Sequence, residues 1–275
     1  GFETLLEGLR TRDGQLASQF FVADTYLALG TSKPLGTSVS KATADEFLAR
    51  AADVFTTLLA RQNETGTPAE SRAEIVRLEP TIRRRLATIR KQQGRWDEAQ
   101  AEIDWILSDP QRRNSLDVQR EAAEVLTAAG LAVAAEDPAK ADGLLREAAA
   151  GRSSAAAPIW GWAGIATKLA RQAFAADDAP ALKAREMFFD ARIRVAQTLL
   201  ERARLPGQAD RAQRLEAATS AIVMTRKLYP DLGGPTTSRR FEAVLEDIQR
   251  EQGATPEGFK QLDRQTGSAP AAANP

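Results

Sequence analysis

Residues 85–110 read RLATIRKQQGRWDEAQAEIDWILSDP, and this stretch decides the fold class. Its apolar residues recur every three or four positions on both sides of Gly94, which is the spacing of amphipathic helices. Because glycine commonly ends a helix, we expect one helix over residues 71–93 and the next over residues 96–107. Pro80 is a point where the first helix could break, since proline lacks a backbone N–H donor.

The same helical pattern continues along the chain in both directions. Ala, Leu, Arg, Glu and Gln are abundant and favour helices, whereas no run alternates with period two for long. Gly30 is expected to end the helix before it, and Gly130 to lie near the end of another. The remaining predicted helices cover residues 15–29, 44–61, 116–129, 138–149, 158–176, 181–204, 209–228 and 238–252. We therefore predict an all-α chain that is more than about two thirds helical.

The composition excludes several kinds of chemistry. The chain of 275 residues contains no His and no Cys, so Ser-His-Asp or Cys-His catalysis, disulfides and zinc sites of the usual kind cannot form within it. Its 37 Lys and Arg equal its 37 Asp and Glu, which argues against a nucleic-acid-binding protein. The longest weakly polar stretch, residues 155–167, is too short to span a bilayer. No metal, cofactor or membrane insertion is expected, and the compartment stays open.

Two segments carry signs of an internal repeat. Residues 21–30 and 85–94 each place a large apolar residue before Ala and end in Gly. In the second segment, Ala87 precedes a Gly94-x-Trp96-x-x-Ala99 element, and Pro110 follows. These residues resemble the tetratricopeptide repeat, in which a small residue on helix A admits helix B, an aromatic residue follows the turn and a proline closes the repeat. The resemblance is strongest over residues 16–110 and weakens further along the chain.

The resemblance implies a right-handed solenoid of antiparallel helix pairs. On that basis we expect one repeat domain over residues 1–265 and a disordered Ala- and Pro-rich tail over residues 266–275. Residues 2–9 look like the end of a helix B whose helix A is missing, so the domain is expected to be cut from a longer array. The alternative is an antiparallel helical array without any relationship to this family.

The function expected from the resemblance is protein–protein interaction, as a scaffold or adaptor that binds a partner on a concave helical surface. In that family helix A lines this surface. The matching positions are Asp24, Arg84, Thr88, Lys91, Arg120 and Glu124. The partner is another protein, which the sequence does not name. The alternatives are a structural subunit of a large assembly and a carboxylate-dependent hydrolase on a helical scaffold, although we expect no enzyme.

Three further groups of residues are candidate sites. The acidic pairs 97–98 and 177–178 could support acid–base chemistry, but acids are also favourable where helices begin. The arginines 83–85 and 112–113 point in different directions on a helix, so solvation or salt bridges explain them better than a binding patch. Trp96, Trp105, Trp160 and Trp162 could stack on a ligand, but packing between helices is the simpler interpretation.

Overall fold

The computed structural model describes residues 8, 16–31, 40–154, 156–207 and 209–266. It is 77% helical, and the described residues form eleven helices and no strand, so the all-α prediction is confirmed. Two compact units divide the chain between Asn114 and Ser115. Repeat arrays are also held together mainly by contacts between neighbouring helices, so two compact units are compatible with the single repeat domain predicted over residues 1–265. That domain stays a prediction. The predictions for residues 2–9 and for the tail fall almost wholly outside the described residues.

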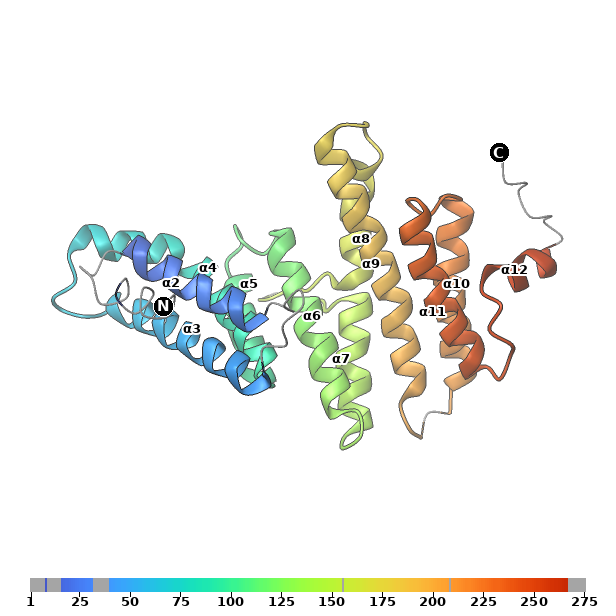
Figure 1. The fold of residues 1–275 in the computed structure, drawn as a ribbon, viewed down its shortest axis with the longest axis horizontal. Helices are drawn as coiled ribbons and strands as arrows, with labels where there is room; N and C mark the ends of the chain where they lie inside the picture. The colour runs from blue at the N-terminus through green and yellow to red at the C-terminus, as the bar shows by residue number, and fades with distance from the viewer. Residues whose placement is uncertain (1–7, 9–15, 32–39, 155, 208, 267–275) are drawn as a thin grey trace. The chain divides into compact units, whose positions relative to one another are not determined.

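Over residues 16–31 and 40–114, the structure describes four helices of the first unit, which Figure 1 draws from blue to green. They are α2 (Leu16–Thr31), α3 (Lys41–Arg61), α4 (Ala69–Gln92) and α5 (Trp96–Ser108). Helix α2 packs on α3, and α4 packs on α5, while α3 also contacts α4. Tyr26, Phe55 and Ile82 are fully buried in a core shared by α2, α3 and α4.

The described residues of the second unit form the other seven helices. They are α6 (Leu116–Val133), α7 (Pro138–Ala150), α8 (Gly161–Ala173), α9 (Ala179–Arg204), α10 (Arg211–Leu228), α11 (Pro235–Glu251) and α12 (Phe259–Thr266). Helix α9 is central, because it packs on α7, α8, α10 and α11 (Figure 1). The main core gathers Trp162, Phe188, Phe189 and Phe241 with aliphatic residues from α6 and α8 to α12.

Four local expectations differ from the structure. Helix α4 runs unbroken through Pro80, with Ile75 and Ile82 buried on either side of it. Packing on both halves thus outweighs the lost hydrogen bond. The helix predicted over 158–176 is shorter, because residues 152 and 159 form an isolated antiparallel bridge before α8. Helix α12 was not predicted, since its sequence is short and polar. The fourth difference concerns Gly30.

Gly30 lies inside α2 and does not end it, whereas Gly130 lies near the end of α6, as expected. Each glycine is a point of close approach between paired helices. A Cβ built on Gly30 would lie 2.7 Å from Leu48 Cγ, and one on Gly130 would lie 2.8 Å from Leu145 Cγ. In both pairs the second helix also approaches with the carbonyl of the alanine four residues before that leucine. The α2–α3 and α6–α7 pairs therefore share one packing geometry, in which glycine admits the neighbouring helix.

Candidate binding groove

The six predicted site residues fall on both units. Asp24, Arg84, Thr88 and Lys91 lie on α2 and α4 of the first unit, and Arg120 and Glu124 lie on α6 of the second. All six side chains are partly buried. Their role in binding a partner stays a prediction, but the structure shows what several of them contact within the chain.

In the first unit, the predicted residues already have internal contacts. Asp24 Oδ1 lies 2.9 Å from Arg85 Nε, so this ion pair connects α2 with α4. The Thr88 hydroxyl donates a hydrogen bond of 3.2 Å to the Arg84 carbonyl one turn earlier. Arg84 and Lys91 also interact with other residues of the chain. Asp24 and Thr88 therefore form contacts within the first unit itself.

The arginine-rich segment of α4 forms salt bridges, as expected. Arg83 lies 2.8 Å from Glu102 and 2.7 Å from Glu79. Burial lowers the pKa of Arg83, but hydrogen bonds and charge attraction from the two glutamates outweigh it, so its pKa is raised. Both carboxylates are nearly buried, which is tolerable because they are paired. Arg83 is thus a link between α4 and α5 and not a free basic group.

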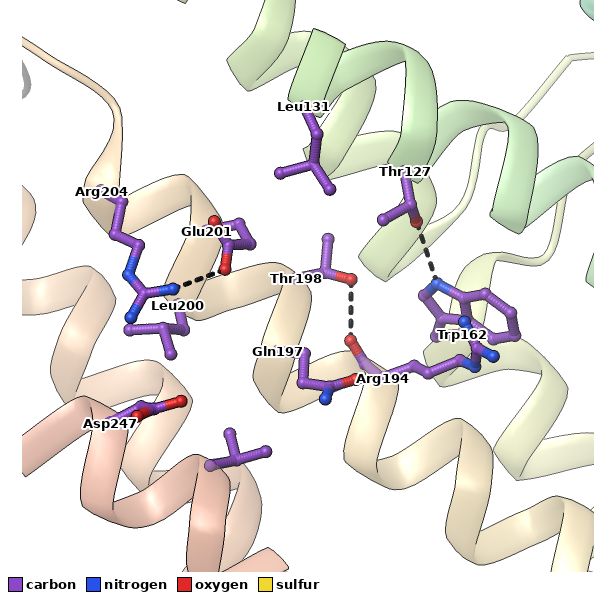
Figure 2. A pocket seen from close by; sticks show the side chains of 11 residues that line it. Thr127, Leu131, Trp162, Arg194, Gln197, Thr198, Leu200, Glu201, Arg204 and Asp247 are labelled. Atoms are coloured by element: carbon purple, nitrogen blue, oxygen red, sulfur yellow. Dashed lines mark hydrogen bonds and ion pairs between the residues drawn. The ribbon is translucent and has the colours of Figure 1, made fainter. Parts of the chain in front are cut away.

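A first cavity of about 220 Å³ lies in the second unit, and we call it the Trp162 pocket. It is lined by Thr127, Leu131, Trp162, Arg194, Gln197, Thr198, Leu200, Glu201, Arg204, Val244 and Asp247 (Figure 2). Trp162 Nε1 donates to Thr127 Oγ1 at 3.3 Å, and the Arg194 guanidinium lies 4.8 Å from the Trp162 ring centre. Arg194 also pairs with Asp190 and, at 3.9 Å, with the predicted residue Glu124.

Most polar groups of the Trp162 pocket are used within the protein. Glu201 pairs with Arg204 at 2.7 Å, and Asp247 pairs with Arg250. Thr198 donates to the Arg194 carbonyl at 2.7 Å. The Trp162 ring is only 1% exposed, so it packs in the core and cannot stack on a ligand. Although Leu131 is exposed at its edge, the pocket offers an arriving molecule few unsatisfied groups.

Trp105 departs from its expected role in packing between helices. It is 37% exposed, because Ala99, Ile103, Ile106 and Leu107 occupy the buried face of α5. The Arg83 guanidinium covers its ring at 4.1 Å from the ring centre, in a cation–π contact. The tryptophan is therefore shielded by an arginine that is itself held by two glutamates.

A second and larger cavity, of about 680 Å³, contains the predicted residue Arg120, and we call it the Arg120 groove. It lies between the first turns of α6, the end of α8 and the first half of α9. Its lining consists of Ser115, Leu116, Asp117, Arg120, Leu169, Gln172, Ala179, Pro180, Lys183, Ala184 and Met187. Leu169 and Ala184 are buried at 4% and 3% exposure, whereas Gln172 and Lys183 are exposed. The groove thus combines an apolar base with a polar rim.

The two cations of the Arg120 groove are not paired with any residue that the structure describes. Within the described part of the chain, neither Arg120 nor Lys183 has an ion-pair or hydrogen-bond partner for its side chain. Asp117, the one acid among the lining residues, does interact with other residues of the chain. Helices α6 and α9 both begin at this groove, where Asp117 and the Asp178 cap already supply the negative charge that helix N-termini favour. The positive charge of the groove comes from Arg120 and Lys183. The groove is therefore electrostatically suited to an anionic group.

Sequence reasoning found Arg120 but missed Lys183, Leu169 and Met187. The spacing of Pro180, Lys183 and Met187 places them on one face of a helix, a signal present in the sequence. Periodicity alone could not show that this face lies beside Arg120, because that depends on how α8 and α9 pack on α6.

The two acidic pairs, residues 97–98 and 177–178, lie where helices α5 and α9 begin, as expected. Asp178 caps α9 by accepting a hydrogen bond from the Ala181 amide at 2.9 Å, and Asp177 pairs with Arg185. Asp97 and Glu98 lie in the first turn of α5. Among the described residues, no group of three acids gathers in a way that could hold a metal ion, and no helix is both long and apolar enough to cross a membrane.

Comparison of the chain with known protein families, with curated proteins and with solved structures found no match.

Proposed function

We propose that this chain is a protein-interaction scaffold, and that the Arg120 groove is one of the surfaces on which it binds a partner. The observation that carries this proposal is the combination within one groove of a buried apolar base and two cations that have no partner among the described residues. An internal cavity of the core would be closed to solvent, and an ordinary solvated surface would lack the buried apolar base. Grooves between helices bind partner segments in this way.

The tetratricopeptide-like solenoid remains part of the proposal. Its support is the shared geometry of the α2–α3 and α6–α7 pairs, in which Gly30 and Gly130 each admit a leucine from the second helix. The α4–α5 pair has a corresponding pattern, with Ala87 on the first helix and Ala99 and Ile103 on the second, all fully buried. A right-handed array of such pairs would present helix A residues, Arg120 among them, on one surface.

The Trp162 pocket does not favour the hydrolase alternative. A hydrolase of this kind needs two carboxyl groups placed across a cleft, of which one holds a proton. Glu201 and Asp247 are the acids that line this pocket, and each pairs with an arginine on its own helix. Both carboxylates are therefore held in ion pairs and do not face each other as an acid–base pair.

Site-specific photo-cross-linking in the cells that produce the chain tests the scaffold proposal. A photoreactive amino acid would replace Gln172 at the groove rim or, as a control, Gln213 on the exposed face of α10. We expect position 172 to give a discrete adduct with one protein, and position 213 to give none of that adduct. Equal adducts at both positions, or none at position 172, would overturn the assignment of the groove.

A further inference from the structure

The charged side chains that line the Arg120 groove carry an excess of positive charge. Of the three charged residues in the lining, Arg120 and Lys183 are cations and Asp117 is an anion. Asp117 has interactions elsewhere in the chain, whereas the two cations have none within the described residues. The cations project from α6 and α9, so they flank the groove from two different helices. A partner that brings carboxylates to both sides would gain charge-assisted hydrogen bonds.

The base of the groove is apolar and belongs to three helices. Leu116 comes from α6, Leu169 from α8, and Ala184 and Met187 from α9. Leu169 and Ala184 belong to the main core, and Leu116 and Met187 pack against it. A cavity of about 680 Å³ has room for several apolar side chains, and methionine adapts its shape to different neighbours. Apolar side chains of a partner would pack on this base and displace water from it.

We infer that the Arg120 groove binds a short acidic segment of a partner protein, with apolar side chains seated between α6, α8 and α9 and carboxylates placed against Arg120 and Lys183. This inference rests on the proposed function and specifies the class of partner. Free phosphate has no apolar group to place on Leu169 and Met187, and the described residues of the groove lining include no aromatic side chain on which a nucleic-acid base could stack. A basic segment would place like charges together.

Three synthetic fluorescent peptides of equal length test the inference with the full chain. The first combines Glu with Leu at helical spacing, the second replaces every Leu with Ser, and the third replaces every Glu with Lys. We expect fluorescence anisotropy to show binding of the first peptide, at least about 10-fold weaker binding of the other two, and loss of affinity as salt rises.

Charge reversal of Arg120 and Lys183 tests whether the peptide binds in the groove. The R120E/K183E variant should weaken the acidic–apolar peptide by at least about 10-fold and improve the basic–apolar one. The control K227E/R239E changes the net charge equally at two exposed residues of α10 and α11 outside the groove. This control should change the affinity for each of the two peptides by less than about twofold relative to wild type, since distant exposed charges are screened. R120Q/K183Q, which adds no acid, should give an intermediate loss, and circular dichroism checks that each variant is folded.

Equal binding of the acidic and basic peptides, or an equal loss in R120E/K183E and K227E/R239E, would overturn the inference. Binding of an oligonucleotide or of inorganic phosphate in competition with the acidic peptide would overturn the choice of partner class. If the cross-link at position 172 forms while the acidic peptide does not bind, the scaffold proposal stands and the partner chemistry fails. If neither occurs, the scaffold proposal itself fails.

Discussion

The buried side-chain amide of Gln249 exchanges two hydrogen bonds with the backbone of Gly258. Gln249 Nε2 donates to the Gly258 carbonyl at 3.0 Å, and the Gly258 amide donates to Gln249 Oε1 at 2.9 Å. Gln249 is 2% exposed near the end of α11, and Gly258 immediately precedes α12. One side chain thereby fixes the chain segment that leads into the last described helix.

Replacing Gln249 with Met should lower the free energy of unfolding by about 1–3 kcal/mol, because the buried Gly258 amide and carbonyl would lose their partners. Urea unfolding followed by circular dichroism measures this. Gln213→Met on the exposed face of α10 is the control, and it should change stability by less than about 0.5 kcal/mol. A smaller loss at position 249 than at position 213 would show that these hydrogen bonds do not hold the segment.

Two glycines in neighbouring helices should respond in opposite directions to alanine. Gly143 in α7 has nothing within 4 Å of the position of an added Cβ, so Gly143→Ala should stabilise the protein by about 0.5–1 kcal/mol through helix propensity. An added Cβ on Gly130 would lie 2.8 Å from Leu145 Cγ. Gly130→Ala should therefore destabilise the protein, because this steric overlap outweighs the gain in helix propensity. Thermal unfolding of the two variants decides this, and equal stabilisation would contradict the close approach of α6 and α7.

The α4–α5 pair gives a similar contrast between two alanines on one helix. Ala99 is fully buried and Ala101 is exposed. Ala99→Leu should destabilise by about 1–3 kcal/mol through overpacking, whereas Ala101→Leu should be nearly neutral. The comparison uses the midpoint of chemical unfolding. If both variants keep the wild-type midpoint, Ala99 does not sit at a tight helix contact and the repeat pattern of this pair is wrong.

The sequence predicted the helices well because each buried face is encoded locally. Ala99, Ile103 and Ile106 are spaced so that any helix there buries the same stripe, and all three are buried. Gly30 shows the limit, since the sequence alone does not distinguish a glycine that ends a helix from one that admits Leu48. Arg120 was found as a site candidate by position in a repeat. Its neighbours Lys183 and Met187 were not, because they reach the groove only through the packing of α8 on α6 and of α9 on α8. That packing leaves no periodic signal in the sequence.

Stability should depend on pH through Asp142, which joins three helices. Its carboxylate lies 3.0 Å from Arg202 on α9 and also contacts Arg214 on α10 at 2.5 Å. Burial raises the pKa of Asp142, but hydrogen bonds and charge attraction from Arg202 and Arg214 outweigh it, so the pKa is lowered. A carboxyl group with a lowered folded pKa stabilises the protein above its unfolded pKa of about 4, and this contribution is lost as pH falls through the folded value.

Asp142→Asn should therefore destabilise the protein at neutral pH, and its difference from wild type should shrink as the pH falls below about 4. Urea unfolding at a series of pH values measures both effects. Glu216→Gln, at an exposed residue of α10, serves as the matched control and should follow the wild-type pH profile. A constant difference between the Asp142 variant and wild type across this range would show that the carboxylate charge is not the source of the stability.

The last prediction separates the Arg120 groove from the helix A surface expected from the repeat resemblance. That resemblance assigns Arg84, Lys91 and Arg120 to one binding surface, whereas the groove is built from the second unit alone. Arg84 and Lys91 already interact with other residues of the chain. With the acidic–apolar peptide as probe, R120E should therefore weaken binding several-fold more than R84E/K91E, although R84E/K91E changes twice as much charge. If R84E/K91E causes the larger loss, the binding surface lies on α4, and the groove is not where acidic segments bind.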